Sequence, residues 1–266
     1  MDATFVSIFC LALIFLSTSL GSALVFFFKR SFSDKVGNVI IGLASGIMVS
    51  ASFFGLLLPS MELAKQSQYL SDYLSFLPPL LGFLLGGFLL YIMDKLIPHL
   101  HLNSGEEEGP KTKLPKNAKF FFAVTIHNIP EGISVGLACG LSLANKGDAS
   151  YIGAALSLTI GIAIQNFPEG AAVSIPLLEE GISKRKSFLM GVASGVVEPI
   201  FGLITLLIAP YVKEALPYLL SIASGAMIYV TIDELLPEAR KGDYVHYGLW
   251  SFMIGFAIMM VLEMTL

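Results

Sequence analysis

The sequence predicts an all-α integral membrane protein with eight transmembrane helices. Of its 266 residues, 55% are hydrophobic and 14% are charged, whereas soluble proteins have about 45–50% apolar and about 25% charged residues. The mean hydropathy is +0.77. The chain also contains repeated apolar runs of the length that a membrane-spanning helix needs, about 20 residues. Most of its surface is therefore expected to face a lipid bilayer.

Eight apolar runs are expected to span the bilayer as one transmembrane domain, 1–266. The runs lie at 3–28, 37–61, 74–97, 118–143, 151–178, 187–209, 216–239 and 245–265. The segment 98–117 is rich in Gly, Pro and charged residues, so it is expected to be a flexible loop. The first run contains the small residues of a signal peptide, but Asp2 precedes it and Lys29 and Arg30 follow it. We therefore interpret it as a retained span.

Basic residues predict the orientation, because cytoplasmic loops are enriched in Lys and Arg. Alternate connections carry 13 of the 16 basic residues, and the other side carries only Lys65, Lys146 and Lys213. Both termini are thus expected outside and the 98–117 loop in the cytoplasm. We expect a multi-pass protein of the cell membrane, meaning the plasma or inner membrane.

Charge and cysteine content exclude other classes. The net charge of −4 provides no basic field for nucleic acid. Cys10 and Cys139 both lie inside apolar runs, so neither a disulfide scaffold nor a cysteine-based zinc site is expected.

Three carboxylates lie near the middle of predicted spans: Glu131 in the fourth, Glu169 in the fifth and Glu198 in the sixth. A charged side chain at the bilayer centre costs at least about 2.5–3.5 kcal/mol, and such residues are usually functional. Their similar depth predicts one shared site. The alternative, in which these are protonated structural residues within interhelical hydrogen bonds, explains three midplane carboxylates less well.

Two of these glutamates belong to a repeated hexapeptide. The sequence HNIPEG occupies 127–132 and QNFPEG occupies 165–170, which is 38 residues later. Because consecutive spans run in opposite directions, the two copies imply a local pseudo-two-fold axis in the membrane plane, as at many transporter substrate sites.

Each hexapeptide places several ligand groups on one helix face. His127 and Asn128 converge with Glu131 because residues three and four apart are neighbours on a helix. Gln165 and Asn166 converge with Glu169 in the same way. Each proline also frees the carbonyl four residues back, which needs a partner in lipid. Oxygen ligands with one imidazole suit a divalent ion of the first transition row. The resulting candidate ligands are His127, Asn128, Glu131, Gln165, Asn166, Glu169 and Glu198.

Further residues are candidates for a route across the bilayer. Met48 and Glu62, with Gly55 between them at heptad spacing, are candidates for the outer half, and Asp94, Asp233 and Glu234 for the inner half. His99 and His101 lie in the loop and are candidates for collecting ions there. Ordinary core packing for Met48, and solvation for the terminal acids and loop histidines, remain alternatives.

The paired hexapeptides, the Glu198-Pro199 pair, the eight spans and the histidine-bearing loop resemble the Zrt/Irt-like (ZIP) family of metal transporters, and most closely its prokaryotic GufA branch. The resemblance covers nearly the whole chain. It implies a 3+2+3 architecture, in which the first and last three spans are inverted repeats around a binuclear metal site. It also implies zinc as the substrate, often with cadmium, iron or manganese, no prosthetic group, and a homodimer.

By position, the resemblance assigns His127, Glu131, Gln165 and Glu169 to a first metal site. It assigns Asn128, Glu131, Asn166, Glu169 and Glu198 to a second. Met48 and Glu62 would belong to the entrance, and Asp94, His99, His101, Asp233 and Glu234 to the exit. Some relatives have Asp at the position of Asn166, and some have a small hydroxyl residue at that of Gly55. These two departures bear on which metal is preferred and how fast it moves, more than on the function itself.

Two functions were weighed. The first is transport of divalent metal ions into the cytoplasm by alternating access, without an ATP site because no G-x-x-x-x-G-K-[ST] motif is present. The second is an intramembrane zinc metalloenzyme of the protease type. Such enzymes usually carry H-E-x-x-H, whereas Asn128 follows His127 here, and the other histidine in a predicted span, His246, lies near the start of the eighth. We therefore expect a transporter and not an enzyme.

Overall fold

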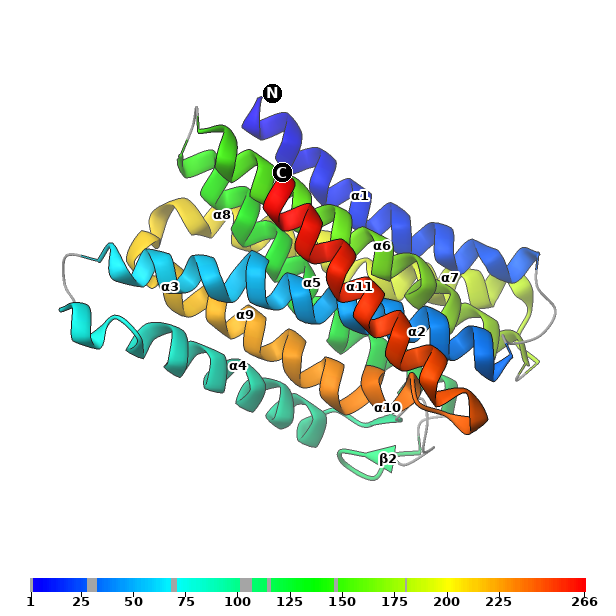
Figure 1. Cartoon of the computed structure of the whole chain (residues 1–266). Helices are drawn as coiled ribbons and strands as arrows, with labels where there is room; N and C mark the ends of the chain where they lie inside the picture. Colours follow the sequence, from blue (N-terminus) through cyan, green and yellow to red (C-terminus); the bar gives the residue numbers. More distant parts are fainter. Residues whose placement is uncertain are drawn as a thin grey trace.

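The computed structural model describes residues 2–27, 33–67, 71–100, 107–113, 116–145, 148–179 and 181–266. Within these ranges the protein is a bundle of long helices (Figure 1). The first half contains α1 (Ala3–Ala23), η1 (Leu24–Phe26), α2 (Asp34–Ser50), η2 (Ala51–Leu57), α3 (Leu58–Lys65), η3 (Asp72–Leu74), α4 (Leu77–Leu96) and α5 (Lys116–Ala144). The second half contains α6 (Ala149–Glu179), α7 (Lys184–Gly195), α8 (Val197–Ile208), η4 (Ala209–Tyr211), η5 (Lys213–Ala215), α9 (Leu216–Val230), η6 (Thr231–Leu235), α10 (Leu236–Glu238), η7 (Gly242–Tyr244) and α11 (Val245–Thr265).

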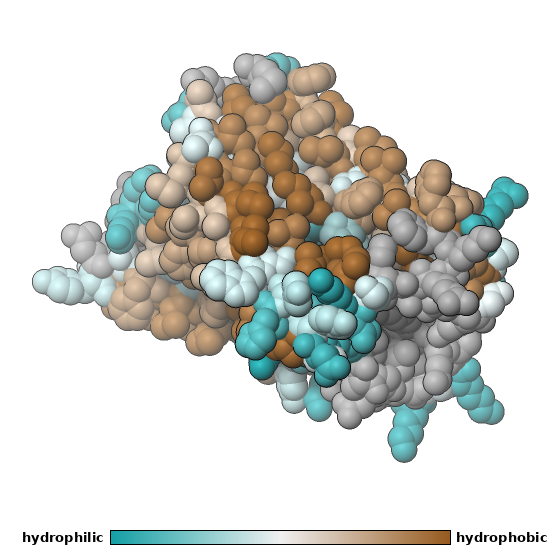
Figure 2. Space-filling view, turned by 45° about the vertical axis from the view of Figure 1, so that its right-hand side comes forward, coloured by the Kyte–Doolittle hydropathy of each residue, from teal (hydrophilic) through white to brown (hydrophobic). Residues whose placement is uncertain are grey.

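The expected helical membrane protein is confirmed. Seven helical stretches within the described ranges are long and apolar enough to cross a membrane. Large apolar side chains point outward along them, such as Leu84 at 60% and Trp250 at 69% exposed. Figure 2 shows hydrophobic residues over a broad area of one face, with hydrophilic residues gathered mainly toward its lower part. Such a surface suits a bilayer, and the protein is a multi-pass membrane protein.

The helix α5, which covers the predicted fourth span, is not among those seven. It has 29 residues, so it is long enough. Its apolar character is interrupted by the polar side chains of His127, Asn128 and Glu131. The segment 98–117 contains a short antiparallel pair, β1 (His99–Leu100) with β2 (Glu107–Glu108), in which His99 lies opposite Glu108. His101 lies outside the described residues.

Two π-helical segments interrupt long helices, and each precedes a proline. The segment η2 lies two residues before Pro59, and η6 lies two residues before Pro237. A proline removes one helical hydrogen bond and clashes with the carbonyl four residues back, and a π turn is one way to accommodate that disruption. Each segment ends in a leucine and is followed by Leu-Pro, so the same sequence, Leu-Leu-Pro, closes both.

The helices pack as two bundles. In the first, α1 packs most extensively on α6, and α5 on α8, with α7 beside α1 and α6. In the second, α11 packs on α2, and α4 on α9, with α3 beside α9. Between the bundles, contacts run chiefly from α5 to α9 and from α2 to α6 and are less extensive. We call these the first bundle and the second bundle.

Candidate metal centre

The two hexapeptides meet inside the first bundle. The Gln165 amide on α6 donates from Nε2 to Glu131 Oε1 on α5 at 2.5 Å. Glu131 is 1% exposed, Gln165 is 3% exposed and His127 is 8% exposed. Glu169 is half-buried one turn from Gln165. The repeated motif therefore brings its carboxylates, its imidazole and a carboxamide to one place on two antiparallel helices.

The other half of the site surrounds Glu198, which is fully buried at the start of α8. Asn166 Nδ2 donates to Glu198 Oε2 at 2.7 Å, and Asn128 Nδ2 donates to Glu198 Oε1 at 3.0 Å. The Thr18 hydroxyl on α1 donates to the same Oε1 at 2.8 Å. Both oxygens of this carboxylate are thus held by donors from three other helices.

The final glycine of each hexapeptide explains why these groups reach one another. A Cβ on Gly132 would collide with the backbone of Glu198, and a Cβ on Gly170 would collide with the backbone of Thr18. Each glycine therefore permits close approach of a neighbouring helix. Thr18 was not among the site residues predicted from the sequence. Gly170 could have indicated it, because Gly170 marks a close approach to the helix that carries Thr18, just as Gly132 marks a close approach to the helix that carries Glu198.

Several oxygens in the site lack hydrogen-bond partners within the described part of the chain. They are Glu131 Oε2, Gln165 Oε1, Asn128 Oδ1 and Asn166 Oδ1, all buried. Buried oxygens without partners are costly, and oxygens of this kind are ligands for cations. Among the described residues, no three His, Cys, Asp or Glu side chains are grouped closely enough to hold a metal ion by themselves. A cation here would therefore need the carboxamide oxygens as well.

A cavity leads from this site to one end of the molecule, between the two bundles. On the side of the first bundle it is lined by His127, Glu131, Gln165 and Glu169, and on the other side by Met48, Glu234 and Glu238. It extends to Gly37, near the start of α2, and to Glu238, at the end of α10. Four carboxylates therefore face one continuous space.

A second pocket lies at the opposite end, also between the bundles. Glu62, Gln66 and Gly55 line it from the second bundle, and Asp148 and Tyr151 from the first. The Ser150 hydroxyl, followed by the Ser150 N–H, holds the pKa of Asp148 below its ordinary value. A Cβ at Gly55 would lie 3.0 Å from Glu263 Oε1 on α11. Glu263 is a further carboxylate near this pocket that the sequence analysis did not identify.

An apolar layer separates the pocket from the cavity. Along each of four helices, buried apolar residues stand between those that line the pocket and those that line the cavity. They are Ala51, Val135, Leu158, Ile162, Ala223 and Met227, each no more than 2% exposed. The site is therefore reached from one end of the molecule and closed toward the other.

The remaining candidates for the route lie in different places. Met48 lines the cavity beside the hexapeptides, whereas Gly55 and Glu62 line the opposite pocket. Asp94 is buried on α4, away from the walls of the cavity, and Asp233 is exposed beside Glu234. His99 belongs to β1. The structure thus brings Met48 and Glu234 to the cavity but leaves Asp94 and Asp233 apart from it.

The fold defines a multi-pass membrane protein, and its first bundle holds a buried cluster of carboxylates and carboxamides beside a cavity between the two bundles. The ZIP Zinc transporter family model matches residues 116–263. The chain is 31% identical to the human zinc transporter ZIP11, over 94% of each protein. It is 33% identical to the zinc transporter GufA of Myxococcus xanthus, over 94% of each. It is 32% identical to the zinc transporter ZIPB of Bordetella bronchiseptica, over 95% of this chain and 78% of that protein. The chain belongs to the ZIP zinc transporter family.

Proposed function

We propose that this protein carries divalent transition-metal ions, zinc foremost, across the membrane into the cytoplasm. The observation that carries the proposal is the group of three carboxylates, Glu131, Glu169 and Glu198, within a lipid-embedded bundle beside a cavity. Zinc is the substrate named for the similar proteins, and cadmium, iron and manganese follow from the mixed nitrogen and oxygen ligands. We also propose that the protein resides in the plasma or inner membrane and forms a homodimer.

The proposal includes eight crossings with both termini outside. Figure 1 shows the two termini at the same end of the bundle, as an even number of crossings requires. The chain reverses at that end after α3, α5 and α8, and at the other end after α1, α4, α6 and α10 (Figure 1). The helix α5 runs the length of the bundle, so it would be the eighth span despite its polar residues. The positive-inside bias supports this orientation.

The packing supports the 3+2+3 inverted repeat. Exchanging the first three helical stretches for the last three, and α5 for α6, converts each extensive contact into another extensive contact. The pair of α1 with α6 becomes that of α8 with α5, and the pair of α2 with α11 becomes that of α9 with α4. The π segments η2 and η6 are also exchanged. A local two-fold relation of this kind places substrate sites at the repeat interface.

We propose two adjacent sets of ligands. His127, Glu131, Gln165 and Glu169 would form the first site, and Asn128, Glu131, Asn166, Glu169 and Glu198 the second. The carboxamides of Gln165, Asn128 and Asn166 donate N–H groups to the carboxylates and have partnerless oxygens. Turning an amide over would present its oxygen to an arriving cation. The amides would thus neutralise the carboxylates when no ion is bound and share in ligation when one is.

The arrangement of the two bundles supports transport by alternating access. All seven proposed ligands belong to the first bundle, and both the cavity and the opposite pocket lie between the bundles. Displacement of one bundle along the other would carry the ligand set past the apolar layer without dismantling it. In the present conformation the site communicates with the end that carries Lys184, Arg240 and Lys241, which we assign to the cytoplasm.

The alternative of an intramembrane zinc metalloenzyme receives no support from the related proteins, which are named as zinc transporters. The residue after His127 is an amide and not a glutamate that could serve as a general base. Within the described helices, His127 is the single histidine beside the three carboxylates.

Reconstitution in metal-free liposomes tests the proposal. We expect external zinc to accumulate in the lumen with wild-type protein, and we expect Glu131→Ala and Glu169→Ala each to abolish this. Glu214→Ala is a matched control, since Glu214 is exposed in η5 away from the cavity, and it should retain the wild-type flux. Absence of zinc flux with folded wild-type protein, or hydrolysis of a membrane peptide in its place, would refute the proposal.

A further inference from the structure

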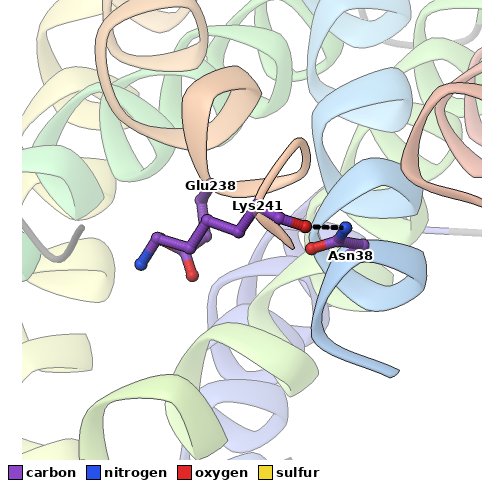
Figure 3. Close-up of polar contacts among 3 residues, drawn as sticks. All are labelled: Asn38, Glu238 and Lys241. Carbon is purple, nitrogen blue, oxygen red and sulfur yellow. Dashed lines mark hydrogen bonds and ion pairs between the residues drawn. The ribbon is translucent and has the colours of Figure 1, made fainter. Parts of the chain in front are cut away.

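The open end of the cavity beside the hexapeptides has an ion pair between the carboxylate of Glu238 and the ammonium group of Lys241. Glu238 lines the cavity at the end of α10, one turn beyond Glu234. Lys241 Nζ lies 2.9 Å from Glu238 Oε2, and the two side chains are 39% and 20% exposed, respectively. Figure 3 shows Glu238 and Lys241 side by side at this turn. Glu238, the carboxylate nearest the open end of the cavity, is thus paired with a positively charged side chain of the protein, that of Lys241.

The backbone of Lys241 is fixed independently of its side chain. Asn38 on α2 is 2% exposed, and its Nδ2 donates to the Lys241 carbonyl oxygen at 2.8 Å (Figure 3). The next residue, Gly242, has φ +60°, a backbone conformation that favours glycine. The turn is therefore held against α2, while the ammonium group at the end of its flexible stem remains free to move between Glu238 and water.

We propose that Lys241 is a tethered competitor for Glu238, so that a departing divalent ion exchanges with the ammonium group at the mouth of the cavity. The ammonium is a compact single charge on a flexible stem. An ion with two charges attracts Glu238 more strongly at equal distance and displaces the ammonium as it arrives. Once the ion has left, the ammonium returns and neutralises Glu238.

This exchange would favour release over recapture. Without Lys241, the Glu238 carboxylate would hold a divalent ion at the exit and slow its departure. The ammonium group can leave Glu238 at modest cost, because the Lys241 side chain is 39% exposed and ion pairs near the surface are weak. It therefore lowers the affinity of the mouth without blocking it. Lys241 would therefore determine how strongly metal ions on the cavity side inhibit further uptake.

The inference rests on the proposed transport function, and its test uses the reconstituted protein with zinc as the probe. The measured quantity is the concentration of zinc on the cavity side that halves the uptake rate. We expect Lys241→Gln to lower that concentration about two- to fivefold, the range for an exposed ion pair. Lys241→Arg should match wild type because it keeps the charge. Adding Glu238→Gln to Lys241→Gln should remove the shift.

A matched control separates the specific pair from a general loss of positive charge. Arg240→Gln removes one charge from the neighbouring, exposed position, and it should leave the half-inhibiting concentration unchanged. If Lys241→Gln behaves as wild type, or if Arg240→Gln produces the same shift, the proposal is overturned.

Equilibrium binding distinguishes failure of this inference from failure of the transport function. In a Glu131→Ala background the central site is impaired, so zinc titration of the purified protein in detergent reports mainly on the mouth. Adding Lys241→Gln should tighten zinc binding by about two- to fivefold. Equal affinities would overturn the exchange whatever the flux shows, whereas a shift without any flux in wild type would refute transport alone.

Discussion

The two bundles place their charged residues in different ways. In the first, Glu131 and Glu198 are buried and held by amides and a hydroxyl of the same bundle. In the second, Glu62, Glu234 and Glu238 lie along the walls of the pocket and the cavity. The first bundle therefore contains all the proposed metal ligands, and the second contributes carboxylates to the walls of the cavity and the pocket. On the proposed mechanism, this division would let the ion and its ligands move together against the second bundle.

The largest expected effect comes from joining the bundles covalently. Ser134 Oγ on α5 donates to Met227 Sδ on α9 at 3.2 Å, across the boundary. With Cys10 and Cys139 replaced by serine, Ser134→Cys combined with Met227→Cys should form a disulfide under mild oxidation. We expect zinc flux to fall to the background of empty liposomes and to recover with dithiothreitol.

The native cysteines provide the matched case within one bundle. Cys10 on α1 and Cys139 on α5 are both buried and both belong to the first bundle. Wild-type protein oxidised to a Cys10–Cys139 crosslink should keep its flux. Loss of flux on this internal crosslink, or normal flux with the crosslink between bundles, would contradict movement of one bundle against the other.

A smaller effect is expected from filling the close helix contacts of the first bundle. Gly170→Ala places a methyl group against the Thr18 backbone, so helices α1 and α6 must separate. Overpacking of this kind costs about 1–3 kcal/mol, measured as free energy of unfolding in detergent. At Gly87 on α4 a Cβ would make only ordinary contacts, the nearest at 3.8 Å. Gly87→Ala should therefore be neutral or stabilise by up to about 1 kcal/mol. Equal destabilisation by both changes would contradict the proposed role of Gly170.

Removal of the Thr18 hydroxyl tests how Glu198 is held. Thr18→Val keeps the shape of the side chain but removes one of the three donors to Glu198. Hydrogen bonds to charged groups contribute about 1.5–3 kcal/mol, so we expect a loss of this size in unfolding free energy. Thr18→Ser retains the hydroxyl and should lose less. An unchanged stability in Thr18→Val would show that the two asparagines suffice.

The smallest effect concerns the pocket at the opposite end. Ser150→Ala removes the hydroxyl that contributes most to lowering the pKa of Asp148, so that pKa should rise toward its ordinary value. Because the folded-state pKa is depressed, the stabilising contribution is present above the unfolded pKa and is lost as the pH falls through the folded value. An NMR titration of the Asp148 carboxyl carbon measures this, with Ser150→Thr as the control. An unchanged titration in Ser150→Ala would show that the backbone N–H alone sets the pKa.

Much of the site was predictable because the motif specifies local geometry. The pairs His127 with Glu131 and Gln165 with Glu169 follow from helical periodicity, and the repeat of the hexapeptide indicated that the two helices meet. The bond from Gln165 to Glu131 is such a meeting. The contribution of Thr18 was not predictable from its own segment, because a threonine in an apolar helix usually bonds only to its own backbone.

The route was harder to predict because it depends on helix irregularity and on packing between bundles. Heptad spacing placed Met48, Gly55 and Glu62 on one face, but that argument assumes 3.6 residues per turn. The π segment η2 lies between Met48 and Glu62 and changes the turn. Ala51 of the apolar layer lies between Met48 and Gly55, so Met48 lines the cavity while Gly55 and Glu62 line the opposite pocket. Asp94 lies near the end of α4 and Glu234 near the end of the helical stretch that begins with α9. The sequence treats these two acids alike, and only the tertiary packing shows that Glu234 lines the cavity and Asp94 does not.

The apolar layer also determines where the membrane potential acts. A water-filled cavity has nearly the same electrical potential as the compartment into which it opens. The voltage therefore falls mainly across the short stretch occupied by Leu158, Ile162, Val135 and Met227. Moving two positive charges through this stretch releases about 4.6 kcal/mol for every 100 mV, inside negative. On the proposed mechanism, passage of the ion across this thin dielectric would be the voltage-sensitive step, and diffusion along a water-filled cavity would be nearly indifferent to voltage.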